Sequence, residues 1–128
     1  MTGDENAATI QSVLVLEDNF LIVMDMEEML AALGVTEVYT ATTADRAMEI
    51  ATEHPIDFAI LDIRLGDETS FTVAEALIAR GIKVGFTSGC GEILPLPNHL
   101  RDVPRIEKPF TEGSLSSLIA AALRSRSP

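Results

Sequence analysis

The stretch Phe58-Ala-Ile-Leu-Asp62-Ile-Arg64-Leu-Gly66 decides how this chain can fold. Four apolar residues lead directly into Asp62, and a polar segment follows Gly66. A short apolar run bounded by turn residues is typical of a strand buried on both faces of a parallel sheet. Asp62 would then lie at the carboxyl end of this strand, the edge of an open α/β sheet where ligands bind. Asp is also common in turns after strands, so Asp62 alone does not distinguish a functional residue from a turn residue.

A second apolar run of the same kind, Val13-Leu-Val-Leu16, also leads into acidic residues, Glu17 and Asp18. Asn19 follows and can cap a helix, because its side chain can accept hydrogen bonds from the first free amides. Apolar residues then recur at helical spacing up to Gly34, where the helix is expected to end. These apolar residues are Ile22, Met26, Met29, Leu30 and Leu33.

The alternation of strand and helix continues along the chain. Further strands are expected at 37–41, 83–88 and 105–107. Helices are expected after Thr43, after Thr69 or Ser70 and after Thr111, with breaks at His54-Pro55 and at Gly81. About five strand–helix repeats with short connections indicate an α/β fold, in which a parallel sheet carries helices on both faces.

Composition limits the class of protein. The chain has 128 residues, enough for one domain with a single core, and 47% of them are hydrophobic. Its formal net charge of -11 argues against nucleic acid or an anionic membrane as a direct partner. The single cysteine, Cys90, excludes an internal disulfide and a cysteine-rich zinc site. Neither a signal peptide nor an apolar run of about 18 residues is found, so a cytoplasmic protein is expected.

Five reactive side chains fall at the carboxyl ends of expected strands. They are Glu17, Asp18, Asp62, Thr87 and Lys108. In a parallel sheet these ends lie along one edge, so the side chains are expected to converge. Three carboxylates together repel each other and require a cation, and a few carboxylate oxygens suit magnesium. The lysine and the hydroxyl can bind an anion, which suggests attack of a carboxylate on a phosphoryl group to give an aspartyl phosphate.

Four motifs, in their order and spacing, resemble those of the receiver domains of two-component response regulators. The motifs are Val-Leu-Val-Leu-Glu17-Asp18-Asn, Ala-Ile-Leu-Asp62, Phe-Thr87-Ser-Gly and Glu-Lys108-Pro109-Phe. The resemblance implies a flavodoxin-like (βα)5 fold, a three-layer sandwich whose parallel sheet has the strand order 2-1-3-4-5. We place the receiver domain at residues 11–124 and expect flexible tails at 1–10 and 125–128.

The resemblance also implies a role for each residue of the cluster. Asp62 would accept a phosphoryl group from a phosphohistidine on a sensor histidine kinase or a histidine phosphotransfer protein. Lys108 and Thr87 would contact the phosphoryl oxygens, and the Lys108-Pro109 bond would be cis. The residues that would hold Mg2+ are Glu17, Asp18, Asp62 and, through its backbone carbonyl, Arg64. The signal would be phosphorylation-dependent binding to a downstream protein.

The sequence departs from most receivers in two places. Arg105 stands three residues before Lys108, where most receivers carry an aromatic residue that moves inward on activation. Arg105 could instead be salt-bridged at the surface or reach the phosphoryl group. Gly and Pro residues occupy 89–104, so an irregular or shortened fourth helix is expected, because an interior proline costs about 3 kcal/mol or more. With Gly-Phe-Thr-Ser-Gly89, these features partly resemble the alphaproteobacterial single-domain receivers that carry a Phe-Ala-Thr-Gly motif.

Three other functions fit parts of the sequence. An aspartate-nucleophile phosphatase of the haloacid dehalogenase group needs a second acid two residues after its nucleophile, where this chain has Arg64. We therefore expect a signalling domain rather than an enzyme. A degenerate receiver would act as a phosphorylation-independent interaction module, but the chain retains all five site residues. The chain could also be a receiver excised from a hybrid kinase or a larger regulator.

Overall fold

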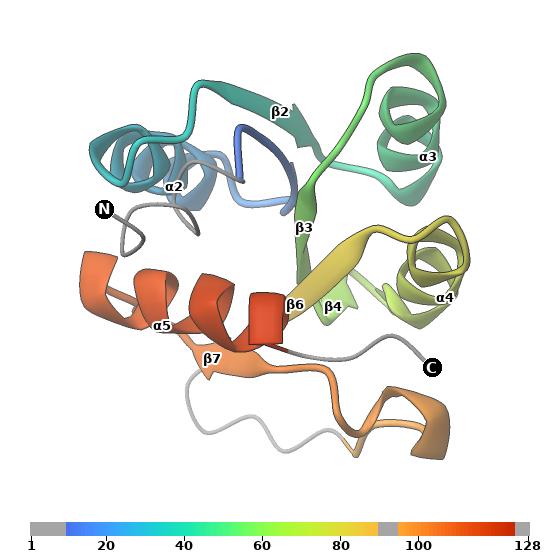
Figure 1. Ribbon diagram of the computed structural model, residues 1–128. Helices are drawn as coiled ribbons and strands as arrows, with labels where there is room; N and C mark the ends of the chain where they lie inside the picture. Colours follow the sequence, from blue (N-terminus) through green and yellow to red (C-terminus); the bar gives the residue numbers. More distant parts are fainter. Residues whose placement is uncertain (1–9, 90–94, 125–128) are drawn as a thin grey trace.

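The computed structural model describes residues 10–89 and 95–124, which form a central parallel sheet between two layers of helices (Figure 1). The strands of this sheet are β1 (Ser12–Leu16), β2 (Glu37–Ala41), β3 (Phe58–Asp62), β6 (Lys83–Ser88) and β7 (Arg105–Glu107). Their order is β2-β1-β3-β6-β7, and every neighbouring pair is parallel. The expected flavodoxin-like order 2-1-3-4-5 is therefore confirmed.

The helices cover both faces of the sheet (Figure 1). Helices α2 (Phe20–Ala32) and α5 (Glu112–Arg124) lie on one face, and α3 (Ala44–Glu53) and α4 (Phe71–Ala79) lie on the other. The core accordingly divides into two buried clusters, one on each face. Strands β1 and β3 are buried along their whole length, because both of their faces carry helices.

The helix ends follow the local sequence. The Asn19 side chain accepts a hydrogen bond from the Leu21 amide at 3.0 Å, and the Thr43 hydroxyl accepts one from the Arg46 amide at 3.2 Å. Gly34 follows α2 with a φ of 97°, a left-handed conformation that glycine adopts without steric cost. Both N-caps and the helix stop at Gly34 are therefore confirmed.

Two segments differ from the simple alternation of strands and helices. A small antiparallel hairpin, β4 (Arg64–Leu65) with β5 (Glu68–Thr69), follows Asp62 directly. Between residues 95 and 104 the only helical element is a single 3-10 turn, η2 (Asn98–Leu100), and Leu100 is buried there. This agrees with an irregular or shortened fourth helix, whereas 90–94 lie outside the described residues. Ile10 lies within the expected N-terminal tail 1–10, but it is buried in the core cluster that also holds residues of α2 and α5.

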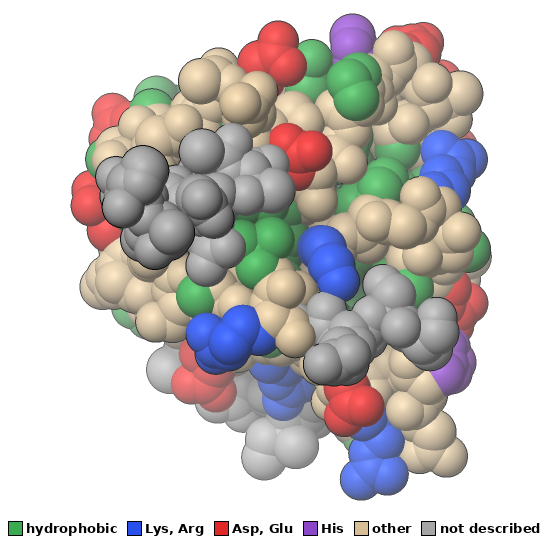
Figure 2. Space-filling view, in the orientation of Figure 1, with side chains coloured by type: hydrophobic (Ala, Val, Ile, Leu, Met, Phe, Trp, Pro, Cys, Tyr) green, Lys and Arg blue, Asp and Glu red, His purple; other side chains and the backbone are tan. Residues whose placement is uncertain are grey.

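Charged side chains are interspersed over the face of the molecule shown in Figure 2, rather than gathered into one patch. Within 10–89 and 95–124, no helix combines the length and the apolar character needed to cross a membrane.

Candidate functional site

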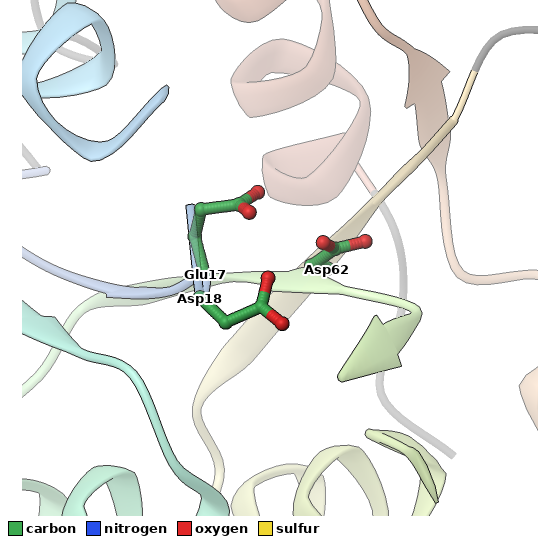
Figure 3. Close-up of side chains that lie close together, drawn as sticks. All are labelled: Glu17, Asp18 and Asp62. Atoms are coloured by element: carbon green, nitrogen blue, oxygen red, sulfur yellow. The ribbon is translucent and has the colours of Figure 1, made fainter. Parts of the chain in front are cut away.

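Three carboxylates meet at the carboxyl edge of the sheet (Figure 3). Glu17 and Asp18 follow β1, and Asp62 is the last residue of the adjacent strand β3. Leu16 pairs with Leu61, so the next residue of each strand lies side by side at the same edge. One oxygen from each carboxylate lies within 4.8 Å of the others. The predicted convergence of the three acids is therefore seen in the structure.

The three acids differ in their access to solvent. Glu17 and Asp62 are 1% and 5% exposed, whereas Asp18 is exposed. Two buried carboxylates and one exposed carboxylate make a site that is open on one side. Such a set fits Mg2+, which binds a few carboxylates and keeps several waters.

Lys108 supplies the positive charge between the buried acids. Its Nζ donates a hydrogen bond to Asp62 Oδ2 at 2.9 Å and lies 2.8 Å from Glu17 Oε1. The contact with Glu17 is an ion pair without hydrogen-bond geometry, since Glu17 Oε1 has no hydrogen-bond partner. The Lys108 amide donates to the Ser88 carbonyl at 2.8 Å, which anchors the lysine beside the end of β6. The Lys108-Pro109 bond is cis, as predicted.

The protonation of Glu17 and Lys108 reflects this shared site. Burial raises the pKa of the Glu17 carboxyl above its usual value of 4.5, and repulsion from Asp62 adds to the rise. The close contact with the Lys108 ammonium and the hydrogen bond from the Asn19 amide oppose it. Burial lowers the pKa of the Lys108 ammonium, but the two carboxylates more than compensate and leave the pKa above 10.5. Lys108 therefore stays charged at neutral pH, and Glu17 is the acid whose ionisation the metal-free protein disfavours.

Backbone amides orient two of the carboxylates. The Asn19 amide donates to Glu17 Oε2 at 3.0 Å, and the Arg64 amide donates to Asp62 Oδ1 at 3.4 Å. Arg64 therefore has its backbone next to Asp62, as the metal-site prediction requires. The role of its carbonyl as a metal ligand stays a prediction.

Two hydroxyls lie at the end of β6. Thr87 is buried and lies in register with Asp62 of the neighbouring strand β3. Ser88 is also buried, and its Oγ has no hydrogen-bond partner. The two side chains point to opposite faces, because successive residues of a strand alternate. Gly85 faces α5, because a Cβ placed on it would meet the Leu118 side chain of that helix. Thr87 is two residues further along the strand and therefore faces α5 as well, whereas Ser88 faces the opposite side together with Phe86.

Ser88 is a candidate site residue that our sequence interpretation did not name. A buried hydroxyl without a partner is costly, and it is available to bind an incoming polar atom. The signal was present in the sequence. In a Phe-Ala-Thr-Gly motif the hydroxyl stands directly before the glycine, and in Phe86-Thr87-Ser88-Gly89 that position is Ser88.

Arg105 stands where most receivers carry an aromatic residue, and its side chain is not buried. It is exposed at the start of β7, in register with Phe86. The predicted site residues that the structure brings into contact or strand register are therefore Glu17, Asp18, Asp62, Lys108 and Thr87. Together they can hold a hard cation and an anion beside a buried carboxylate.

Comparisons with known proteins agree with this site. The family described as response regulator receiver domain matches residues 13–93. The transcriptional regulatory protein PdtaR of Mycobacterium tuberculosis is 33% identical over 81 residues, which are 63% of this chain and 40% of PdtaR. The phyllosphere-induced regulator PhyR of Methylorubrum extorquens is 32% identical over 125 residues, which cover 94% of this chain and 47% of PhyR. This chain thus spans less than half the length of these two curated relatives.

A solved structure extends the comparison to the whole fold. The solution structure of SdrG from Sphingomonas melonis Fr1 has a TM-score of 0.80 to this chain at 39% sequence identity. The similarity covers 90% of this chain and 98% of SdrG. The residues that the family model matches, 13–93, include the three acids at the edge of the sheet.

Proposed function

Because this chain belongs to the response regulator receiver domain family, we propose that it is a phosphorelay signalling domain that accepts a phosphoryl group on Asp62. The phosphoryl group would come from the phosphohistidine of a sensor histidine kinase or a histidine phosphotransfer protein. The phosphorylated chain would then bind a downstream protein. The observation that carries this proposal is the position of Asp62. It is buried within a cluster of three acids, and its Oδ2 lies 2.9 Å from Lys108 Nζ.

In the proposed reaction, an oxygen of Asp62 attacks phosphorus and the phosphorus–nitrogen bond of phosphohistidine breaks. The electron pair of that bond leaves with the imidazole, which is neutral after the bond breaks because the other ring nitrogen of the phosphohistidine already carries a proton, and the product is an aspartyl phosphate. Mg2+, held by Glu17, Asp18, Asp62 and the Arg64 carbonyl, would offset the negative charge on the phosphoryl oxygens. The buried position of Asp62 keeps competing water away from the acyl phosphate.

Lys108 is the residue whose partner would change during the reaction. In the free protein its ammonium lies between Asp62 and Glu17. After transfer, one Asp62 oxygen is bonded to phosphorus as an acyl phosphate, and the phosphoryl oxygens carry more negative charge than the remaining carbonyl. We propose that Lys108 then pairs with a phosphoryl oxygen, which passes the change at Asp62 to the segment that follows β7.

The direct test is phosphorylation by a small phosphodonor in the presence of Mg2+. Intact mass spectrometry should show one added phosphoryl group, and omission of Mg2+ should suppress the product. A chain that remains unlabelled under conditions that label another receiver domain would contradict the proposed function.

The two hydroxyls of β6 give a separate prediction. We expect Thr87→Ala and Ser88→Ala to be labelled at Asp62, but the variant that lacks the acting hydroxyl should lose the conformational response to beryllofluoride. Ser88 has the stronger structural support, because its Oγ has no partner in the free protein. Removal of an unpartnered buried hydroxyl should also leave the free protein as stable as wild type or more stable.

The measurement is the change in amide chemical shifts of residues 95–107 when beryllofluoride is added. Loss of the response in Ser88→Ala alone would assign the role to Ser88. Loss in Thr87→Ala alone would support the residue that we inferred from the sequence. Normal responses in both variants would exclude both hydroxyls from signalling.

A further inference from the structure

Two buried serine hydroxyls have no hydrogen-bond partner in the protein without a phosphoryl group, here called the free form. Within 10–89 and 95–124, the buried side-chain oxygens of this kind are Ser70 Oγ, Ser88 Oγ and Glu17 Oε1, and Glu17 forms an ion pair with Lys108. Ser70 is 0% and Ser88 is 1% exposed, so bulk solvent reaches neither hydroxyl. A buried hydroxyl without a partner destabilises the conformation that contains it, because it has given up its hydrogen bonds to water.

The Ser70 hydroxyl does not cap the helix that it precedes. Ser70 stands directly before α4, where a serine side chain usually accepts a hydrogen bond from an amide of the first turn, but here it accepts none. Its ψ of 14° is far from the extended conformation of a capping residue. The helix begins regularly all the same, because the Ala74 amide donates to the Ser70 carbonyl at 2.9 Å. Capping therefore does not account for a buried serine at this position.

Ser70 and Ser88 belong to segments that meet directly after Asp62. The Ile63 amide donates a hydrogen bond to the Thr87 carbonyl at 2.9 Å, and the Ser70 amide donates to the Ile63 carbonyl at 2.9 Å. Ile63 thus links the backbone of Ser70 to the end of β6. The Ile63 side chain lies in the core cluster on the face of α3 and α4, which is also the face to which Ser88 points.

An aromatic contact joins the same two segments a second time. Phe71, the first residue of α4, packs edge-on against Phe86 of β6, with 6.0 Å between the ring centroids. Phe86 is two residues before Ser88 and points to the same face of the sheet. The segments 70–71 and 86–88 are therefore held together through both backbone and side chains. A movement of Ser88 must change the surroundings of Ser70.

We propose that Ser70 is a positioning residue that biases the receiver toward its phosphorylated conformation. This inference rests on the proposed function and takes Ser88 as the hydroxyl that turns to a phosphoryl oxygen. When Ser88 turns away from α4, the space that it leaves admits one water, which hydrogen-bonds to Ser70 Oγ and to the second lone pair of the Ile63 carbonyl. The unpartnered Ser70 hydroxyl then destabilises the free form alone, and the loss of this penalty favours the phosphorylated conformation.

The first test is Ser70→Ala, which removes only the hydroxyl. It should raise the midpoint of thermal unfolding of the metal-free protein, because the unpartnered group is gone. It should also weaken the binding of beryllofluoride in the presence of Mg2+ by about tenfold, because it stabilises the free form and not the bound one. A hydroxyl with a purely structural role would not combine a gain in stability with a loss of beryllofluoride affinity.

Ser12→Ala is the matched control. Ser12 is also buried, but its hydroxyl donates to the Pro55 carbonyl at 2.8 Å. Its removal should lower the unfolding midpoint, because the Pro55 carbonyl loses a partner, and should leave the affinity for beryllofluoride unchanged. If Ser70→Ala lowers the midpoint as Ser12→Ala does, or binds beryllofluoride as tightly as the wild type, the proposal is wrong.

The water is tested without Mg2+ or a phosphoryl group. Ser88→Gly removes the side chain that fills the space beside Ser70 in the free form. A crystal structure of this variant should show a water hydrogen-bonded to Ser70 Oγ, and a structure of the wild type should show none at that atom. A water at Ser70 in both structures, or in neither, would overturn the proposal.

A double variant links the two serines. In the Ser88→Gly protein the Ser70 hydroxyl has a partner, so adding Ser70→Ala should lower the unfolding midpoint, the opposite of its effect in the wild type. The same direction in both backgrounds would show that the two hydroxyls are independent, against the proposal. If the wild type binds no beryllofluoride and takes no phosphoryl label, the proposed function fails, whereas the crystal structures and these melts still decide whether displacement of Ser88 gives Ser70 a partner.

Discussion

Asp62→Asn is expected to fold like the wild type and to take up no phosphoryl group. The carboxamide has the shape of the carboxylate, and its oxygen can still accept the hydrogen bond that Lys108 donates at 2.9 Å. It lacks the anionic oxygen that attacks phosphorus, so labelling by a small phosphodonor with Mg2+ should drop below detection in intact mass spectra. The substitution also removes one of two buried carboxylates at this edge, and the free protein should therefore lose little stability.

The matched control for this prediction is Asp67→Asn. Asp67 is an exposed acid in the turn between β4 and β5, a few residues beyond the acceptor, and its substitution changes the net charge equally. Asp67→Asn should be labelled at the wild-type rate. If Asp62→Asn is labelled as fast as Asp67→Asn, another residue is the acceptor and the assignment of Asp62 is wrong.

The sheet and its active edge were predictable because their signals are local. Continuous apolar runs such as 58–61 identify strands that are buried on both faces, and the residue that ends each run must lie at the sheet edge. Helix ends were predictable for the same reason. The side chains of Asn19 and Thr43 can accept hydrogen bonds from the first amides of a helix, and Gly34 can adopt the positive φ that often ends one. Strand order followed from the family resemblance, since periodicity alone does not say which strands are neighbours.

The hairpin after Asp62 and the surface of α2 were not predicted. Each strand of the hairpin has only two residues, and the chain turns at Gly66, where φ is 61°. A pattern of alternating apolar residues cannot be recognised in strands this short. In α2 the helical spacing identified the apolar side but not its centre. The buried residues are Val23, Met26 and Leu30, whereas Ile22 and Met29 are partly exposed. The rotation of α2 about its axis depends on how the helix packs in the folded core, and a sequence pattern does not contain that information.

The second large effect is expected at the metal site. Each of Glu17→Gln and Asp18→Asn removes one negative charge from the cluster, and the double variant leaves Asp62 as its only carboxylate. One carboxylate beside Lys108 should no longer bind Mg2+, so the thermal shift that Mg2+ produces should vanish. For a wild-type site at about 100 times its Kd, that shift corresponds to about 2.7 kcal/mol. Glu27→Gln with Glu28→Gln, two exposed acids of α2, is the control with equal charge change.

The same double variant should be more stable than the wild type when no metal is present. Burial raises the pKa of Glu17 in the folded protein above the value of 4.5 that the unfolded chain has. Between these two values the folded state holds a proton that the unfolded state has lost, so the wild type loses stability as pH rises through this window and remains destabilised above it. Glu17→Gln cannot ionise and removes this loss. Thermal melts from pH 4 to 8, with and without Mg2+, test both the loss of the Mg2+ shift and the gain in stability of the metal-free variant. A Mg2+ shift in the double variant equal to that of the control would refute the metal site.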